Sequence, residues 1–311
     1  MSDIKLFHIH GDTVMQLQGT SVAVEKSLQG LIERHLDTFL GVRFLAHEYK
    51  TGKTHGGRID TLGIDENGSP VIIEYKRALN QNVINQGLYY LDWLLDHKAE
   101  FKLLVLERFG MEQANAIEWG APRLLCVASD FTKFDEHAVG QINRSIELIR
   151  YRRYGDELLL FELVNTPMEQ VVDEDNIAGT GQVLQVAPKG TTVYRTVSEC
   201  LDQMTEAQRD RFEALKAFLL ALGNDVQVKI LKYYIAFRRI KNFACVEVRT
   251  QSENLVVYVK VDPTSITLEP HFTRDVRSVG HYGTGDLEIT IRNDADLERA
   301  KPLLLKSYEA S

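Results

Sequence analysis

The spacing of apolar residues changes period several times in the first half of the chain, and each period predicts a kind of element. From Ser21 to Gly41, apolar residues recur three and four positions apart, which is typical of one face of a helix with a serine cap and a glycine stop. Runs that alternate, or that are apolar throughout, predict strands. By these criteria we expect strands at 42–49, 101–107, 123–129 and 157–164, short strands within 1–20 around a turn at Gly11 and Asp12, and helices at 82–97, 111–119 and 134–151.

A hairpin followed by alternating helices and strands predicts an α/β layer that is complete near residue 165. We therefore assign residues 1–167 to an N-terminal domain with a mixed sheet flanked by helices. Residues 168–192 are acidic and then rich in Gly, Thr and Gln without a sustained period, so we interpret them as a linker. An ordered loop lying across the first domain fits this composition nearly as well.

Residues 193–311 form a second predicted domain, of the α+β class. Two helical patterns come first, the segment 226–240 fits either a helix or a strand, and two alternating runs then predict a hairpin around 251–254. A last helix is expected from Asp294, which would cap it, with Pro302 as a site of kinking.

The segment 58–76 predicts a β-hairpin, because Asn67–Gly68 is a strong turn signal between two alternating runs. Its register depends on the length of the loop. A two-residue loop would place Asp60 opposite Tyr75, whereas a three-residue loop that ends in a left-handed glycine would place Asp60 opposite Glu74. We predict the three-residue register, or a bulge with the same effect.

In that register, Asp60, Glu74 and Lys76 lie together at the open end of the hairpin, next to an apolar face. Carboxylates in such a place are costly unless a cation binds them, and oxygen ligands suit Mg²⁺ or Mn²⁺. The ion would activate a water and stabilise charge on a phosphoryl group, with Lys76 beside it and the carbonyl of Tyr75 as a further ligand. From hairpin chemistry alone, a solvated cross-strand ion cluster explains the same residues equally well.

The same residues carry a resemblance to a known superfamily. Asp60, a turn, and then Glu74-x-Lys76 at the end of an apolar strand resemble the PD-(D/E)xK nucleases, which have the restriction-endonuclease-like fold. The string GRIDTLGIDENGSPVIIEYKR is most similar to NucS-like endonucleases, although the Pro that often precedes the Asp is replaced by Ile59. The resemblance implies that Asp60 and Glu74 bind the metal and that Lys76 assists the attacking water.

The resemblance extends from the first helix to about Tyr90 and implies further site residues. Gln86 and Tyr90 share one helix face and match a pair that supports the site in RecB-like nucleases, although a core tyrosine and a surface glutamine would give the same spacing. Glu33 matches a glutamate that contacts the metal or its water in many relatives, with Glu25 as the alternative and a solvated helix charge as the simpler explanation. The site expected from the sequence has Asp60, Glu74, Lys76 and Gln86 for catalysis, Asp60, Glu74, Tyr75 and Glu33 for the metal, and Tyr90, Arg58, Arg77, Arg152 and Arg153 for nucleic-acid binding or site support.

Composition narrows the class of protein. With 44% hydrophobic and 26% charged residues in 311, the chain is an ordinary globular protein long enough for two cores. Its 3 cysteines are far apart and suit buried thiols in a reducing compartment, and neither a signal sequence nor a long apolar run is found, so we expect a cytoplasmic protein without a membrane span. The net charge of −8 excludes a surface coated in positive charge, but not a nucleic-acid enzyme with local basic groups.

Other motifs give weaker signals. The segment 8–12 matches the HxHxD pattern of di-metal hydrolases, but Thr13 stands where those enzymes have another His, and an exposed strand explains it better. No G-x-S-x-G elbow and no Walker motif occurs. Basic and aromatic residues interleave at 150–154 and 232–243, where phosphate contact and base stacking compete with cations at a helix end and an amphipathic core element.

The tail from 278 to 310 resembles an uncharacterised domain family that is often appended to nuclease-like N-terminal domains. The sequence therefore leads us to expect a Mg²⁺- or Mn²⁺-dependent endonuclease acting on nucleic acid, DNA rather than RNA. Its second domain would recognise the substrate or a partner, or form a homodimer. Two alternatives remain open: a nucleic-acid-binding protein that keeps the nuclease fold without cutting, and an interaction scaffold dominated by the second domain.

Overall fold

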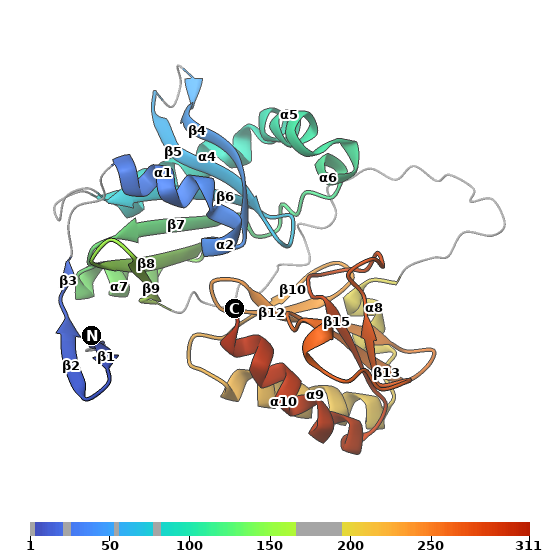
Figure 1. Ribbon diagram of the computed structural model, residues 1–311. Helices are drawn as coiled ribbons and strands as arrows, with labels where there is room; N and C mark the ends of the chain where they lie inside the picture. The colour runs from blue at the N-terminus through green and yellow to red at the C-terminus, as the bar shows by residue number, and fades with distance from the viewer. Residues whose placement is uncertain (1–3, 21–25, 53–55, 77–81, 166–194) are drawn as a thin grey trace. The chain divides into compact units, whose positions relative to one another are not determined.

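The computed structural model describes the ranges 4–20, 26–52, 56–76, 82–165 and 195–311 (Figure 1). The chain divides into two compact units, Met1–Met168 and Glu169–Ser311. Ser21, Glu25, Arg77 and the predicted linker 168–192 lie outside the described residues.

The first unit is built on a 7-stranded mixed sheet with the order β3-β8-β7-β6-β5-β4, and β9 pairs with β8. The pairs β4–β5 and β5–β6 are antiparallel, whereas β6, β7 and β8 run parallel to one another. The strands are β3 (Gly19–Thr20), β4 (Val42–Lys50), β5 (Arg58–Asp65), β6 (Pro70–Lys76), β7 (Arg123–Ala128), β8 (Ser145–Tyr154) and β9 (Leu158–Leu163). The predicted mixed α/β sheet is thus confirmed.

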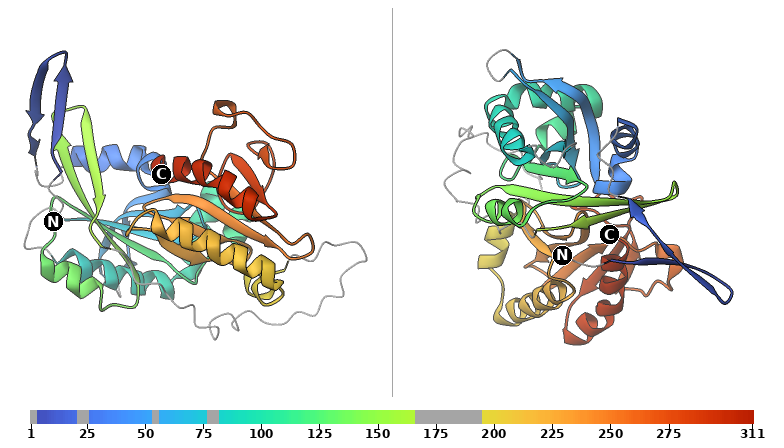
Figure 2. Two further views of the ribbon diagram at one scale, coloured as in Figure 1. Left: turned by 90° about the horizontal axis from the view of Figure 1, so that it is seen from below. Right: turned by 90° about the vertical axis from the view of Figure 1, so that its left-hand side faces the viewer.

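Helices lie on both faces of this sheet, with α1 on one face and α4 on the other (Figures 1 and 2). Side chains of α4 and α5 form a core with the sheet, in which Trp93, Leu94 and Phe101 are fully buried against Leu62 and Leu124. A separate two-stranded sheet, β1–β2, projects from the unit (Figure 2). The elements are β1 (Leu6–His10), β2 (Thr13–Leu17), α1 (Lys26–Arg34), α2 (Leu36–Leu40), α4 (Val83–Asp96), α5 (Lys98–Phe109), α6 (Met111–Asn115) and α7 (Lys133–Val139).

Several predicted elements are confirmed in place. The early turn joins β1 to β2, the first helical pattern ends at Gly41 in the left-handed conformation (φ 62), and the helix expected at 82–97 is α4. The strands expected at 42–49, 123–129 and 157–164 are β4, β7 and β9.

One predicted element is of the wrong type, and two predicted helices are present only in part. The expected strand 101–107 is part of helix α5, because Phe101 and Val105, four positions apart, are the residues it buries. The expected helix 134–151 is split: α7 ends before Gly140, and the alternating run from Ser145 forms strand β8. The helix expected at 111–119 is limited to α6. The basic and aromatic run 150–154 therefore lies within a strand.

The second unit has a 6-stranded sheet in which all neighbours are antiparallel, in the order β10-β11-β12-β13-β15-β14. The ambiguous segment 226–240 supplies β10 and β11. The elements are α8 (Val197–Asp202), α9 (Glu206–Ala221), β10 (Gln227–Ile230), β11 (Ile235–Arg238), β12 (Asn242–Arg249), β13 (Asn254–Val259), the 3₁₀ turn η2 (Pro263–Ser265), β14 (Thr273–Asp275), β15 (Leu287–Ile291) and α10 (Asp294–Glu309).

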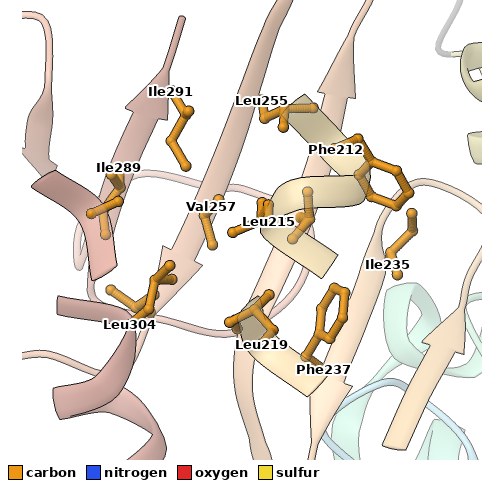
Figure 3. Close-up of a cluster of buried hydrophobic side chains, with 14 of the residues drawn as sticks. Phe212, Leu215, Leu219, Ile235, Phe237, Leu255, Val257, Ile289, Ile291 and Leu304 are labelled. Atoms are coloured by element: carbon orange, nitrogen blue, oxygen red, sulfur yellow. The ribbon is translucent and has the colours of Figure 1, made fainter. Parts of the chain in front are cut away.

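The core of the second unit lies between one face of its sheet and the helices α9 and α10, where Leu215, Leu219 and Leu304 meet Phe237 and Val257 (Figure 3). None of the helices within the described ranges is long and apolar enough to span a membrane.

One detail of the last helix differs from the prediction. Asn293, and not Asp294, caps α10, because its side chain accepts a hydrogen bond from the Asp296 amide (2.9 Å).

Candidate active site

The turn between β5 and β6 has the predicted three-residue loop. The amide of Asp65 donates to the carbonyl of Ser69 (2.9 Å) across the base of the turn, and Gly68 adopts the left-handed conformation with φ 79. This register places Leu62 opposite Ile72, as expected. Leu62 and Ile72 therefore lie on the same face of the hairpin, as the three-residue loop predicts.

At the open end of the hairpin, hydrogen bonds from backbone amides to carboxylate side chains replace the backbone–backbone hydrogen bonds between the strands. The last paired residues are Thr61 and Ile73. Beyond them, the Asp60 amide donates to Oε1 of Glu74 (3.1 Å), and the Tyr75 amide donates to Oδ2 of Asp60 (3.1 Å). Each carboxylate thus accepts a hydrogen bond from the opposite strand, and this reciprocal pair holds both carboxylates at the same end of the hairpin.

Glu74 is only 1% exposed, whereas Asp60 is half-buried. In the parallel register between β6 and β7, the neighbour of Glu74 is Cys126. Burial raises the pKa of the Cys126 thiol, and the charges of Glu74 and Asp135 raise it further, against the opposing effect of Lys76. Cys126 is therefore a neutral thiol beside a buried carboxylate that already accepts a hydrogen bond from the Asp60 amide.

Lys76, the last residue of β6, is 4% exposed. Its Nζ lies 3.5 Å from Oδ2 of Asp135 on α7 and 5.7 Å from the centroid of the Phe131 ring. Burial alone would raise the pKa of the Asp135 carboxyl, but hydrogen bonds from Thr132 and the charge of Lys76 together lower it. Asp135 was missed in the sequence, although the Thr132-x-x-Asp135 capping motif was visible there.

Gln86 and Tyr90 meet on one face of α4 and hold the start of β5. The Tyr90 hydroxyl accepts hydrogen bonds from the Arg58 amide (3.0 Å) and from Nε2 of Gln86 (3.2 Å). Tyr90 also packs closely on Gly57, where a Cβ would lie 2.4 Å from Cε1 of the ring. The pair thereby fixes the backbone next to Asp60.

Glu33 approaches β5 from helix α1. Its Oε1 accepts a hydrogen bond from Oγ1 of Thr61 (2.6 Å) and from Nε2 of Gln29 (3.1 Å), and it lies 3.3 Å from Nδ1 of His47. Because successive side chains of a strand point to opposite faces, Thr61 and Asp60 face opposite sides of the sheet. The described contacts of Glu33 thus belong to the far side of the strand from Asp60.

The candidate arginines lie at different distances along the sheet. Arg58 pairs with Glu48 (3.1 Å) close to the site. Arg152 and Arg153 continue β8 beyond the end of β7, and Arg153 is engaged by the turn that follows it, through Asp156 (3.1 Å) and the carbonyl of Gly155 (3.1 Å). The structure therefore brings Arg58 to the hairpin and places the other two on β8, which β7 separates from β6.

The donor set fits a hard divalent cation. Two carboxylates, one of them buried, and the carbonyl of Tyr75 offer only oxygen atoms, and Mg²⁺ requires no more than one or two carboxylates beside water and phosphate oxygens. In the described part of the chain, no three His, Cys, Asp or Glu side chains lie close enough together to hold a metal ion. A metal at this site would therefore be held by Asp60 and Glu74, with the remaining ligands from the backbone and the solvent or substrate.

The comparison with known proteins gives a family match within the second unit. Residues 198–311 match the model of a family described as a domain of unknown function (DUF5655). An uncharacterized protein of Haemophilus influenzae is 28% identical over 312 residues, which cover 98% of this chain and 100% of that protein. No solved structure matches the chain. The expectation of an appended C-terminal domain agrees with the family match.

Proposed function

We propose that the first unit is a Mg²⁺- or Mn²⁺-dependent endonuclease of the PD-(D/E)xK type that hydrolyses phosphodiester bonds in nucleic acid. The observation that supports it most directly is the reciprocal pair of hydrogen bonds between the strands that carry Asp60 and Glu74. The pair holds both carboxylates at the open end of the hairpin, and the buried Lys76 follows Glu74 by two positions on the same strand, in the order of residues that the superfamily uses. The mixed sheet flanked by helices is the architecture that this proposal requires.

The residues of the site have separate roles in the proposed reaction. Asp60 and Glu74 would hold the cation, Glu74 from a buried and Asp60 from a half-buried position. A divalent ion bound there supplies an acidified water and an electrostatic clamp for the phosphate oxygens. Lys76 holds a positive charge at the same edge, where it orients the attacking water and offsets the negative charge that develops on the phosphate. Tyr90 and Gln86 fix the strand that carries Asp60.

DNA is the proposed substrate, in the cytoplasm, with the second unit serving to recognise the substrate or a partner. Cleavage of both strands of a duplex requires two sites or two visits, so a homodimer is included in the proposal. A non-cleaving protein with the same fold is the second candidate, but it gives no reason for Asp60, Glu74 and Lys76 to remain together at one edge.

The test is cleavage of single-stranded, duplex, branched and mismatched DNA, and of RNA, with and without Mg²⁺ or Mn²⁺. We expect Asp60→Asn, Glu74→Gln and Lys76→Met each to lower the rate by about 10²-fold or more, because each removes a group that stabilises the transition state. Glu107→Gln on the exposed face of α5 is the matched control and should cleave like the parent.

Two outcomes contradict the proposal in different ways. Equal cleavage by the parent and by Asp60→Asn would show that the activity belongs to a contaminant. Tight binding of DNA without divalent-dependent cleavage would favour the non-cleaving candidate. A scaffold protein would show neither, and Asp60→Asn would leave its behaviour unchanged.

A further inference from the structure

We propose that Asp135 is a positioning residue that holds the Lys76 ammonium at the candidate active site. Helix α7 places the Asp135 carboxylate where it can pair with Lys76. The catalytic consequence rests on the proposed nuclease function. The contact itself does not, so the two can be tested separately.

The Lys76 side chain has a small neighbour, Ala128, and an aromatic neighbour, Phe131. In the parallel register, Lys76 lies beside Ala128 of β7, whose methyl side chain leaves room for the longer lysine. The Phe131 ring contacts the ammonium group, and Asp135 lies 3.5 Å from it. A buried ammonium needs such partners, because a charge that is buried without them is costly.

The orientation of Asp135 is fixed by the cap of α7. Oδ2, the oxygen that pairs with Lys76, also accepts hydrogen bonds from the amide (2.8 Å) and the hydroxyl (3.0 Å) of Thr132. In return, the Asp135 amide donates to the Thr132 hydroxyl (3.2 Å). One carboxylate oxygen therefore serves both the helix cap and the lysine.

Helix α7 is in turn fastened to the sheet by Arg150 of β8, which is 3% exposed. Its guanidinium pairs with Asp130 before the helix (2.9 Å), with Glu162 of β9 (3.0 Å) and with Glu136 within the helix (3.9 Å). Because these partners come from three segments, Arg150 fixes the helix relative to the strands. Asp135 therefore meets Lys76 at a defined place.

The pairing also keeps Lys76 away from the carboxylates that hold the cation. Glu74 is fully buried on the same strand and face as Lys76, two positions before it. Without Asp135, the ammonium would gain most by turning to Glu74, where it would compete with the divalent ion for the same oxygens. Asp135 thus holds the Lys76 ammonium on the side of α7 and away from the carboxylates of the hairpin.

A matched pair of substitutions separates charge from capping. Glutamate and glutamine both serve at the third position of a capping box, so Asp135→Glu keeps the cap and the charge, whereas Asp135→Gln keeps the cap and removes the charge. Glu199→Gln makes the same change in the capping box of Thr196 in the second unit and controls for the substitution itself.

The first measurement needs no substrate. The full-length protein is acetylated briefly with an amine-reactive ester, and the modification of Lys76 is quantified by peptide mass spectrometry against the exposed Lys133. We expect Asp135→Gln to raise the relative rate at Lys76 several-fold, and Asp135→Glu and Glu199→Gln to match the parent. Equal rates at Lys76 in the Gln and Glu variants of Asp135 would overturn the proposed contact.

The second measurement is the dissociation constant of Mn²⁺, by titration calorimetry. We expect Asp135→Gln to weaken Mn²⁺ binding several-fold, with no such effect once Lys76 is replaced by Met. A loss of the same size in the Lys76→Met background would overturn the proposal, since Asp135 would then act without Lys76. In cleavage assays, Asp135→Gln should lower kcat more than it changes KM for DNA. Absence of divalent-dependent cleavage by the parent would overturn the nuclease function, while the acetylation rates would still decide the contact.

Discussion

A second group of buried charges in the first unit lies at the opposite end of β6 from the candidate site. Arg123 makes two hydrogen bonds to Glu147 (2.7 and 2.8 Å) and one to Asp65 (3.0 Å), and all three side chains are buried. Burial by itself lowers the pKa of the Arg123 guanidinium, but the charges and hydrogen bonds of Glu147 and Asp65 raise it overall. Because Asp65 also closes the hairpin turn, this cluster ties the turn to β7 and β8.

Removal of the Arg123 guanidinium from this cluster should strongly destabilise the first unit. Arg123→Met removes the cation that pairs with two buried carboxylates, and we expect a loss of about 3–5 kcal/mol in the free energy of unfolding of the first unit. Urea denaturation followed by fluorescence measures it. Arg153→Met is the control, since its pair with the exposed Asp156 should contribute no more than about 1 kcal/mol. Similar losses in the two variants would show that the buried cluster is not a major source of stability.

The depressed pKa of Asp135 has a consequence for stability against pH. A carboxyl whose pKa is lower in the folded than in the unfolded protein contributes stability above its unfolded pKa and loses it as the pH falls through the folded value. We therefore expect Asp135→Gln to be less stable than the parent at pH 7, and the difference to shrink as the pH falls from about 5 to about 3, around the ordinary Asp value of about 3.9. Urea unfolding at several pH values measures it; a difference independent of pH would contradict the lowered pKa of Asp135.

At the scale of elements, the β5–β6 hairpin depends on a glycine that can adopt positive φ. At Gly68 (φ 79), a Cβ would lie 2.9 Å from the carbonyl oxygen of Ala116, so an alanine meets both a strained backbone and a collision with main chain. At Gly155 (φ 61), in the turn between β8 and β9, a Cβ would meet nothing within 4 Å. The two positions therefore separate conformational strain from steric overlap.

We expect Gly155→Ala to cost about 1–2 kcal/mol, the strain of a left-handed non-glycine residue, and Gly68→Ala to cost clearly more. Gly68→Ala should also lower cleavage, because it disturbs the register that pairs Asp60 with Glu74. Denaturant unfolding and the cleavage assay measure the two effects. Full activity in Gly68→Ala would show that the site tolerates a change in the turn.

Local signals explain which elements could be predicted. The Asn67–Gly68 turn and the helical spacing before His97 are contained in a few adjacent residues, so the hairpin and α4 followed from the sequence. The apolar run 101–107 supports either a strand or a helix, and only the depth of Phe101 and Val105 in the core decides for α5. Tertiary burial, which a single run does not encode, accounts for this error.

The same distinction applies to the candidate site. Asp60, Glu74 and Lys76 are joined by one hairpin, so their spacing could be predicted. Asp135 reaches Lys76 only because β6, β7 and β8 are parallel and bring the start of α7 to the end of β6. Its capping motif predicts the beginning of a helix but says nothing of which strand that helix meets.

At the scale of the whole molecule, each unit has a hydrophobic core of its own. Leu215 is fully buried in the second unit, and Leu94 is fully buried in the first. We expect Leu215→Ala and Leu94→Ala each to cost about 2–5 kcal/mol, but in different calorimetric transitions. Below the melting temperature of the second unit, Leu215→Ala should leave DNA cleavage unchanged. A single transition that both variants shift equally would show that the units unfold together.

The close contact between Gly57 and the Tyr90 ring also limits how this protein can evolve. A side chain at position 57 would overlap the ring of Tyr90, whose hydroxyl accepts the hydrogen bond from the Arg58 amide. A larger residue at position 57 therefore requires a smaller residue at position 90. A lineage without the tyrosine would need another group to hold the strand of Asp60. Descendants that keep the tyrosine should therefore also keep the glycine, whereas loss of the tyrosine frees position 57 to change.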